Sequence, residues 1–413
     1  MLMPENDLQD IFLGRQPILD RDNHIVAYEL LFRSGQVSEA LVQDDLQASA
    51  QVIVQAFSER DIASVLGGKK GFINVSVDLL LSDIIELLPS DKVVIELLET
   101  IQINEQIISR CSDLKAMGFS LALDDFIGGP QFVPLFDIVE VVKFDLPLMG
   151  LADLKKNVAY LKHWPLQLLA EKVEDIGQAE HCKDLGFDLF QGYYYARPVI
   201  LSGKRPDASK LALTRLVGLV LNDAETFEIE QAFKHDPSLS YNLLRLVNSV
   251  AMGMNHKISS LKHAIIVLGR QQLQRWLQLL LFVNQDGDMH SPLLELAATR
   301  GRLMELLATV QVKDKDYHGR AFMVGIMSLL DTLLCMQLED IIKQVNLSND
   351  IEKALLEHGG PLGNLLLLVK KMEQTDFDAA AAILDKMRLS RTDLTQAQME
   401  AMRWANDIKE LAE

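Results

Sequence analysis

Short apolar runs that end in a polar, mostly ionisable side chain recur along the first half of this 413-residue chain. They return at intervals of roughly 20 to 25 residues, which is about the length of one strand, one helix and their connections. A closed barrel gathers the carboxyl ends of all its strands around one mouth, whereas an open doubly wound sheet gathers fewer of them in one crevice. The regularity therefore predicts an α/β barrel of the (β/α)8 TIM type with a polar mouth. The residues at the ends of the runs are Glu29, Asn74, Glu96, Asp124, Asp125, Lys143, Asp145, Glu171 and Gln191.

The apolar runs are predicted to form strands, and the stretches between them have helical periodicity. We expect strands at residues 25–31, 71–75, 92–97, 120–123, 139–144, 166–169 and 189–191. We expect helices at residues 44–65, 77–87, 104–116, 152–163 and 176–184. Because no GxGxxG sequence follows an early strand, a dinucleotide-binding fold is disfavoured.

The second half of the chain has helical periodicity almost throughout, which predicts an all-α domain. The stretch with the sequence SGKRP interrupts both patterns and is typical of a linker. We therefore expect a barrel domain at residues 8–200 and a helical domain at residues 201–413, with the linker at about 197–208.

The bulk composition excludes several classes of protein. A net charge of −18 disfavours a nucleic-acid or anionic-membrane binder, which would need a basic face. The three cysteines lie far apart, which argues against a zinc site and fits a reducing compartment. The most apolar run, residues 276–283, is much shorter than the roughly 20 residues that span a bilayer. With no signal peptide at the N-terminus, we expect a cytoplasmic protein without a membrane span.

Several carboxylates in one mouth would repel one another unless a cation compensated them. Mg²⁺ and Mn²⁺ prefer oxygen ligands, and Asn74 adds a neutral carbonyl oxygen to the set. The adjacent Asp124 and Asp125 could serve two metals, the usual device for phosphodiester hydrolysis. Lys143 could orient or deprotonate a water, and Arg33 is placed to contact a phosphate or a guanine edge. On chemistry alone, an enolase-type barrel with Mg²⁺ and a lysine base remains an alternative.

Eight short sequences then identify a family that the first half resembles, and together they cover most of residues 10–200. They are RQPI (15–18), YELLFR (28–33), INVS (73–76), VIELLE (94–99), LALDDF (121–126), VKFD (142–145), LAEKVE (169–174) and FQGYYYARP (190–198). In this order they resemble the EAL domain, the cyclic di-GMP phosphodiesterase family.

The resemblance implies a role for each matching residue. The implied metal ligands, for two Mg²⁺ or Mn²⁺ ions, are Glu29, Asn74, Glu96, Asp124, Asp125 and Glu171. Lys143 would act on the catalytic water, with Glu171 and Asp125 as its partners in catalysis. The implied substrate contacts are Gln16, Arg33, Asp145, Glu174 and Gln191. Glu99 would anchor the loop after the DDF sequence, and a homodimer through the barrel is a further implication.

The chain departs from the family pattern at three places. The signature triplet is Glu29-Leu30-Leu31, the loop after DDF reads IGGP at residues 127–130, and Lys172 stands inside the AEKVE sequence. The main expectation is a phosphodiesterase that opens cyclic di-GMP to linear pGpG by a two-metal mechanism. The alternative is a catalytically inactive cyclic di-GMP receptor, or a protein-interaction regulator, that signals through the helical domain.

The second half also resembles a known family. The sequences HDPSLSYNLLRLVNS (235–249), ISSLKHAIIVLG (258–269) and RWLQLLL (275–281) are similar to the HDOD domain, a relative of HD phosphohydrolases that lacks their metal site. His235-Asp236 is interpreted as a helix cap before Pro237 and not as a metal dyad. The whole chain thus resembles the YuxH-like EAL–HDOD signalling class, with an unidentified protein partner for the HDOD half.

Overall fold

The computed structural model describes residues 11–34, 66–98, 101–192, 208–234, 243, 260–282, 292–334, 336–345 and 347–410. The chain divides into two compact units. We call the first the barrel unit; it contains Met1–Val199, His290–Thr299 and Leu368–Glu413. The second, the helical unit, contains Ile200–Met289 and Arg300–Leu367.

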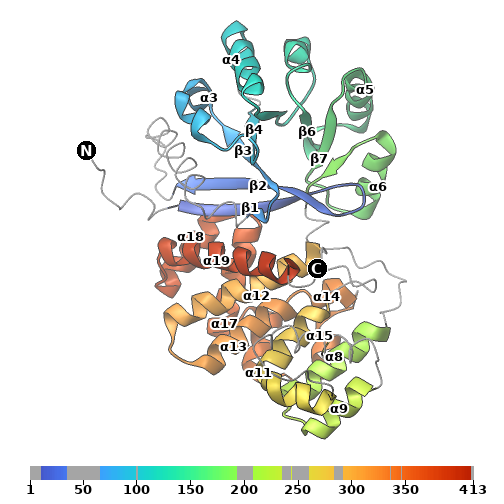
Figure 1. Cartoon of the computed structure of the whole chain (residues 1–413), viewed down its shortest axis with the longest axis vertical. Helices are drawn as coiled ribbons and strands as arrows, with labels where there is room; N and C mark the ends of the chain where they lie inside the picture. Colours follow the sequence, from blue (N-terminus) through green and yellow to red (C-terminus); the bar gives the residue numbers. More distant parts are fainter. Residues whose placement is uncertain are drawn as a thin grey trace, which may run out of the picture. The chain divides into compact units, whose positions relative to one another are not determined.

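Eight strands close into a barrel in chain order, from β1 to β8, which confirms the predicted fold class (Figure 1). The strands are β1 Ile11–Leu19, β2 Ile25–Ser34, β3 Lys70–Val75, β4 Val93–Leu97, β5 Ser120–Leu123, β6 Val141–Asp145, β7 Gln167–Glu171 and β8 Leu189–Phe190. From β2 to β8 the neighbours are parallel, but β1 runs antiparallel to both β2 and β8. The carboxyl ends of seven strands and the amino end of β1 therefore meet at one mouth.

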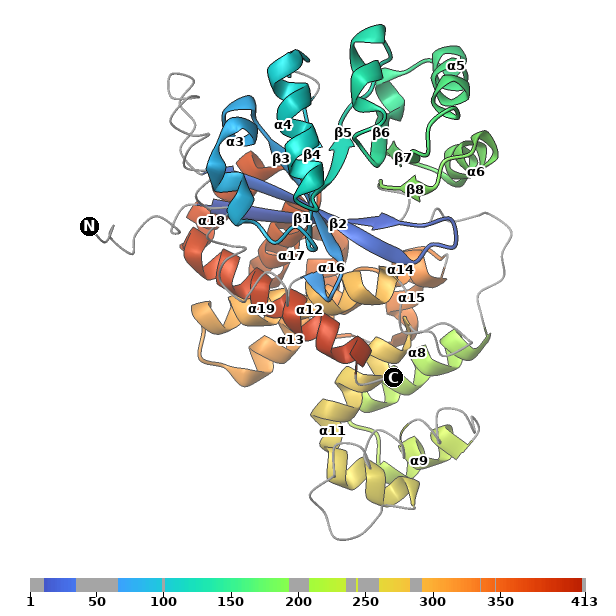
Figure 2. The same ribbon diagram turned by 45° about the horizontal axis from the view of Figure 1, so that its top comes forward.

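Helices cover the outside of the parallel strands (Figure 2). They are α3 Val77–Leu81, η2 Asp83–Leu87, α4 Glu105–Ala116, η3 Pro130–Leu135, η4 Leu146–Leu148, α5 Leu151–Leu161 and α6 Ile176–Leu185. The side chains of Ser76, Asn104 and Asp175 accept hydrogen bonds from backbone N–H groups in the first turns of α3, α4 and α6. These caps fix where each helix begins after its strand.

The observed elements differ from the predicted ones at specific places. Strand β1 was not expected, because Gly14 and Pro17 interrupt its apolar alternation. The helix expected at 77–87 is divided, because the Ser82 side chain caps η2 and ends α3. The helix expected at 44–65 lies outside the described residues.

The helical unit confirms the prediction of an all-α second half. Its helices are α8 Ala208–Leu221, α9 Thr226–Lys234, α11 Leu261–Leu280, α13 Lys315–Met327, α14 Leu330–Leu334, α15 Leu338–Val345 and α16 Asn349–Glu357, with the larger parts of α12 Pro292–Gln311 and α17 Gly360–Glu373. Helix α11 is kinked at Gly269, whose φ of 75° is non-helical. Helices α12 and α13 approach closely where Gly301 faces Gly325. No helix in the described part of the chain is both long and apolar enough to cross a membrane.

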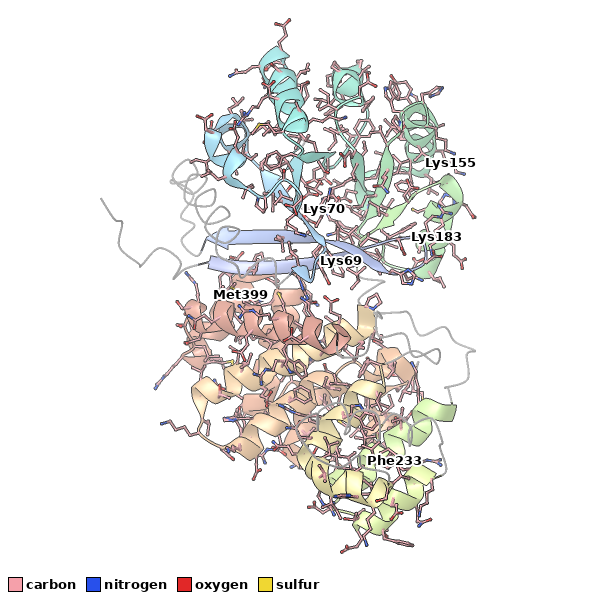
Figure 3. All side chains as sticks on the ribbon, viewed as in Figure 1. Lys69, Lys70, Lys155, Lys183, Phe233 and Met399 are labelled. Atoms are coloured by element: carbon pink, nitrogen blue, oxygen red, sulfur yellow. The ribbon has the colours of Figure 1, made fainter. Side chains whose placement is uncertain are left out.

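Two further helices follow the helical unit in sequence but belong to the barrel unit. They are α18 Phe377–Met387 and α19 Arg391–Glu410. Helix α19 packs along β1, and Met399 of α19 contacts the barrel's outer core (Figure 3). Both helices lie in the part of the chain expected to be the helical domain, and the domain limits of 8–200 and 201–413 stay a prediction.

Candidate active site

One buried side chain from each of the eight strands forms an apolar layer inside the barrel. The layer contains Ile18, Ala27, Phe72, Val94, Ala122, Val141, Leu169 and Leu189. Because strand side chains alternate between faces, the residue two positions nearer the mouth also points inward. That step leads to Gln16, Glu29, Asn74, Glu96, Asp124, Lys143, Glu171 and Gln191. We call these eight residues the mouth layer.

The centre of the mouth layer is Lys143, which is 1 % exposed. Its Nζ lies 2.7 Å from Glu96 Oε1, 2.8 Å from Glu171 Oε1 and 2.9 Å from Asp124 Oδ1. Glu29 Oε1 is more distant, at 3.7 Å. Four predicted metal ligands thus converge on one point, which is occupied by the ammonium group.

A second set of contacts joins the amide side chains to Glu29. Asn74 Nδ2 donates to Glu29 Oε1 at 3.1 Å, and Gln191 Nε2 donates to Glu29 Oε2 at 2.6 Å. Gln191 Nε2 also lies 2.7 Å from Gln16 Oε1. The oxygens of Asn74 and Gln191 therefore remain available for a cation or a ligand.

Asp125 reaches the site by a different route. It follows β5 with a φ of 43°, in the left-handed region, so it leaves the strand's alternation. One carboxylate oxygen from each of Asp124, Asp125 and Glu171 lies within 4.8 Å of the others, as for ligands of one metal ion. Asp124 and Asp125 thus both place a carboxylate in the site, although their backbones have different conformations.

The donor set suits a hard divalent cation. Asn74 Oδ1, Glu96 Oε2 and Gln191 Oε1 are buried and accept no hydrogen bond from any described residue. A buried acceptor without a partner is costly, and an oxygen-coordinated cation such as Mg²⁺ or Mn²⁺ would supply one. The site can therefore hold a divalent cation between the carboxylates and these oxygens.

Burial and the neighbouring carboxylates raise the pKa of two acids in the mouth layer. Burial raises the pKa of Glu96 well above its usual range, opposed by Lys143, and Glu29 and Asp124 raise it further. Burial likewise raises the pKa of Glu171 to about 7. For Lys143, burial lowers the pKa, but Glu96 and the other carboxylates outweigh it and hold the pKa well above 10.5.

Lys172 also forms an ion pair at the mouth. Its side chain, which is 63 % exposed, binds Oδ2 of the buried Asp145. Asp145 Oδ1 also caps the short helix η4 by accepting from the N–H of Leu148, at 3.4 Å. Lys172 has a φ of 55°, in the left-handed region of the backbone, which glycine adopts more readily than a residue with a Cβ. Asp145 is thus held beside the mouth layer with its charge compensated.

The remaining predicted residues lie at the margin of the site or outside the described part. Glu174 is exposed after β7, and its backbone N–H donates to Gln178 Oε1 at 2.8 Å. Arg33 is the last residue but one of strand β2, but its side chain lies outside the described residues, as does Glu99. Phe126 is buried against Phe132, Phe136 and Phe144, which anchors the start of the loop at 127–130.

Strand β1 contributes Gln16, which the pattern of apolar runs did not find. The spacing of Gln16 and Ile18 is the signal that could have revealed the strand. Residues two positions apart on a strand point to the same face, and here both side chains point into the barrel. The fold and this mouth define a class: a barrel with an oxygen-rich, acidic site suited to divalent cations, followed by a helical unit.

Comparison with known proteins agrees with this class. The family model of the EAL domain matches residues 7–198, and that of the HDOD domain matches residues 210–358. The uncharacterized protein YuxH of Bacillus subtilis is 30 % identical over 96 % of this chain and 98 % of its own length. The cyclic di-GMP phosphodiesterase CdgJ of Vibrio cholerae is 30 % identical over 98 % of this chain and 95 % of its own length. The chain belongs to the family of proteins in which an EAL domain is followed by an HDOD domain.

Among solved structures, a standalone EAL protein from Vibrio cholerae O395 in its c-di-GMP-bound form is 24 % identical. The similarity covers 46 % of this chain and 92 % of that one, with a TM-score of 0.36.

Proposed function

We propose that this protein hydrolyses cyclic di-GMP to linear pGpG with the help of two Mg²⁺ or Mn²⁺ ions. The observation that carries the proposal is the mouth layer, in which one inward side chain per strand contributes to a single acidic, oxygen-rich site around Lys143. The curated name of the relative CdgJ, a cyclic di-GMP phosphodiesterase, supports the same substrate.

Each group in the site has a proposed task. Bound cations would polarise the scissile phosphodiester and lower the pKa of a water. Glu29, Asn74, Glu96, Glu171 and the aspartate pair would hold the cations. Lys143 would orient the attacking water, since its Nζ lies between the same carboxylates. The proposed substrate contacts are Gln16, Arg33, Asp145, Glu174 and Gln191.

One observation favours the second candidate, a receptor that binds cyclic di-GMP without turnover. Lys172 places a cation beside the mouth, where it binds Asp145 and interacts with Asp125 and Glu171. A cation there would compete with a metal ion for the carboxylates. The receptor would then use the HDOD half, and a protein partner that binds it, to transmit the signal.

A turnover assay separates the two candidates. The full-length protein is incubated with cyclic di-GMP and Mn²⁺, and pGpG is followed by chromatography. We expect product from the wild type, none from Glu29→Ala or Lys143→Ala, and wild-type turnover from Asp22→Asn. Asp22 is the matched control, because it is an exposed carboxylate in the turn between β1 and β2. Binding without product in the wild type would refute the enzyme and leave the receptor.

Other properties of the protein are part of the same proposal. We infer a cytoplasmic location, because the substrate is an intracellular type of nucleotide and the described helices include no membrane span. A homodimer through the barrel and a separate protein partner for the HDOD half complete it. Size-exclusion chromatography with light scattering tests the dimer.

A further inference from the structure

The β1–β2 hairpin presents different residues on its two faces. Gln16 pairs with Glu29 in the register, and both belong to the mouth layer. Their chain neighbours Arg15 and Tyr28 therefore point to the opposite face of the hairpin. A side chain that binds Arg15 and Tyr28 therefore contacts the same two strands that carry Gln16 and Glu29.

Glu295, in the first turn of α12, binds both of these neighbours. Arg15 Nη2 lies 2.6 Å from Glu295 Oε1. The Tyr28 hydroxyl lies 2.7 Å from Oε1 and 2.8 Å from Oε2 of the same carboxylate. The Arg15 guanidinium also lies over the Tyr28 ring, 4.3 Å from its centroid. We call these three residues the back cluster.

The charged side chains of the back cluster are buried. The side chains of Arg15 and Glu295 are 5 % and 6 % exposed. The Tyr28 hydroxyl is itself buried and donates to the Glu295 carboxylate. Separating the two charges of a buried ion pair is costly, so these contacts oppose a shift of the hairpin away from Glu295.

The hairpin needs this support because β1 has little sheet on its other side. In the described part of the barrel, β8 pairs with β1 only at Leu19. Farther along β1, Gln398 of α19 donates to the carbonyl oxygen of Leu13 at 3.1 Å. The Phe377 ring stacks on Phe12 with the centroids 5.6 Å apart. Segments from the end of the chain thus cover the edge that a neighbouring strand would occupy.

We propose that Glu295 is a positioning residue for the metal site: by binding Arg15 and Tyr28, it fixes the places of Gln16 and Glu29 in the mouth. The inference rests on the proposed function, because Glu29 is a proposed cation ligand. Helix α12 continues to Gln311, and its residues from Arg300 onward belong to the helical unit.

Calorimetric titration of the full-length, metal-free protein with MnCl₂ tests the proposal, because it measures cation binding without turnover. Residues that hold a metal ligand in place change metal affinity by about 10- to 100-fold when they are altered. We expect Glu295→Gln, which keeps the side chain's size, to weaken Mn²⁺ binding about tenfold. Tyr28→Phe, which removes only the hydroxyl, should weaken it in the same direction.

The matched control is Gln398→Leu, which removes another buried contact of the same hairpin without touching the back cluster. Urea denaturation of each variant reports general destabilisation. We expect Gln398→Leu to lose stability while its Mn²⁺ affinity stays within twofold of the wild type.

Three results would overturn the inference. The first is an Mn²⁺ affinity within twofold of the wild type in both Glu295→Gln and Tyr28→Phe. The second is an equal loss of affinity in Gln398→Leu, which would show that loosening the hairpin anywhere has the same effect. The third is a wild type that binds no Mn²⁺, and this result alone would also overturn the proposed function. If Glu295→Gln does not fold, the Tyr28→Phe result decides.

Discussion

Replacing Lys143 by methionine removes the only positive charge at the centre of the mouth layer. Its ammonium lies within 2.9 Å of Glu96, Glu171 and Asp124 and is 1 % exposed. Removing one partner of a buried ion pair costs roughly 3 to 5 kcal/mol, because the remaining charge stays buried without compensation. We expect the metal-free Lys143→Met protein to lose stability of that order.

The loss should depend on pH, and its sign follows from the raised pKa of Glu171. Its folded-state pKa of about 7 lies above the ordinary value of 4.5. Between these two values the folded chain binds more protons than the unfolded chain, so this group's contribution lowers stability as the pH rises. The Lys143 ammonium lowers the pKa of Glu96 and of Glu171, so without it these two acids hold their protons still more tightly. The variant should therefore be closest to the wild type near pH 5 and farthest from it near pH 8.

Divalent cations should reverse the loss. In the wild type a cation must displace the Lys143 ammonium from the carboxylates, whereas in Lys143→Met it meets no competing charge. We expect MnCl₂ to stabilise the variant more than the wild type in urea denaturation at pH 8. The control is Lys155→Met on α5, an exposed lysine whose loss should change stability by less than about 0.5 kcal/mol (Figure 3).

A metal-free Lys143→Met protein that loses less than about 1 kcal/mol at pH 8, and gains no more stability from Mn²⁺ than the wild type, would contradict this prediction. Such a result would mean that the carboxylates do not share the ammonium in solution, against the several-kcal/mol cost of a broken buried pair.

Three further predictions concern other parts of the chain. Gly325→Ala should destabilise the helical unit by about 1 to 3 kcal/mol, because the new Cβ would lie 2.6 Å from Gly301 Cα; Gly319→Ala in the same helix should not, and urea denaturation compares them. Cys111 should resist iodoacetamide at pH 8 until urea is added, because burial raises its pKa to about 12. Labelled Cys111 found by peptide mass spectrometry in the absence of urea would contradict this. Lys172→Gly should strengthen Mn²⁺ binding about two- to fivefold by removing an exposed competing charge, and weaker binding in calorimetry would contradict this.

Much of the mouth could be predicted from sequence because it follows a local rule. Glu96 stands two residues after the inward Val94, and Glu171 stands two after Leu169, so alternation alone directs each carboxylate to the mouth. Asp125 stands one residue farther from its strand than Asp124, and it reaches the site through a left-handed backbone conformation. Alternation does not encode that turn.

The rest could not be predicted because it depends on contacts between distant residues. Arg15 and Glu295 are 280 positions apart, and neither lies in a local pattern that indicates the other. Strand β1 could not be predicted because Gly14 and Pro17 break its apolar alternation. It forms by pairing with β2 and β8, which closes the barrel. The ion pair of Lys172 with Asp145 likewise required the fold to bring the ends of β6 and β7 together.

The barrel unit is built from three separate segments of the chain. The EAL match ends at residue 198, yet the compact unit that contains the barrel also takes in His290–Thr299 and Leu368–Glu413. A gene fragment that stops at the family boundary would leave Arg15 without Glu295, Leu13 without Gln398 and Phe12 without Phe377. The two named domains are therefore not interchangeable modules in this chain. Exchanging the HDOD half for another domain would require the recipient to supply its own cover for the hairpin.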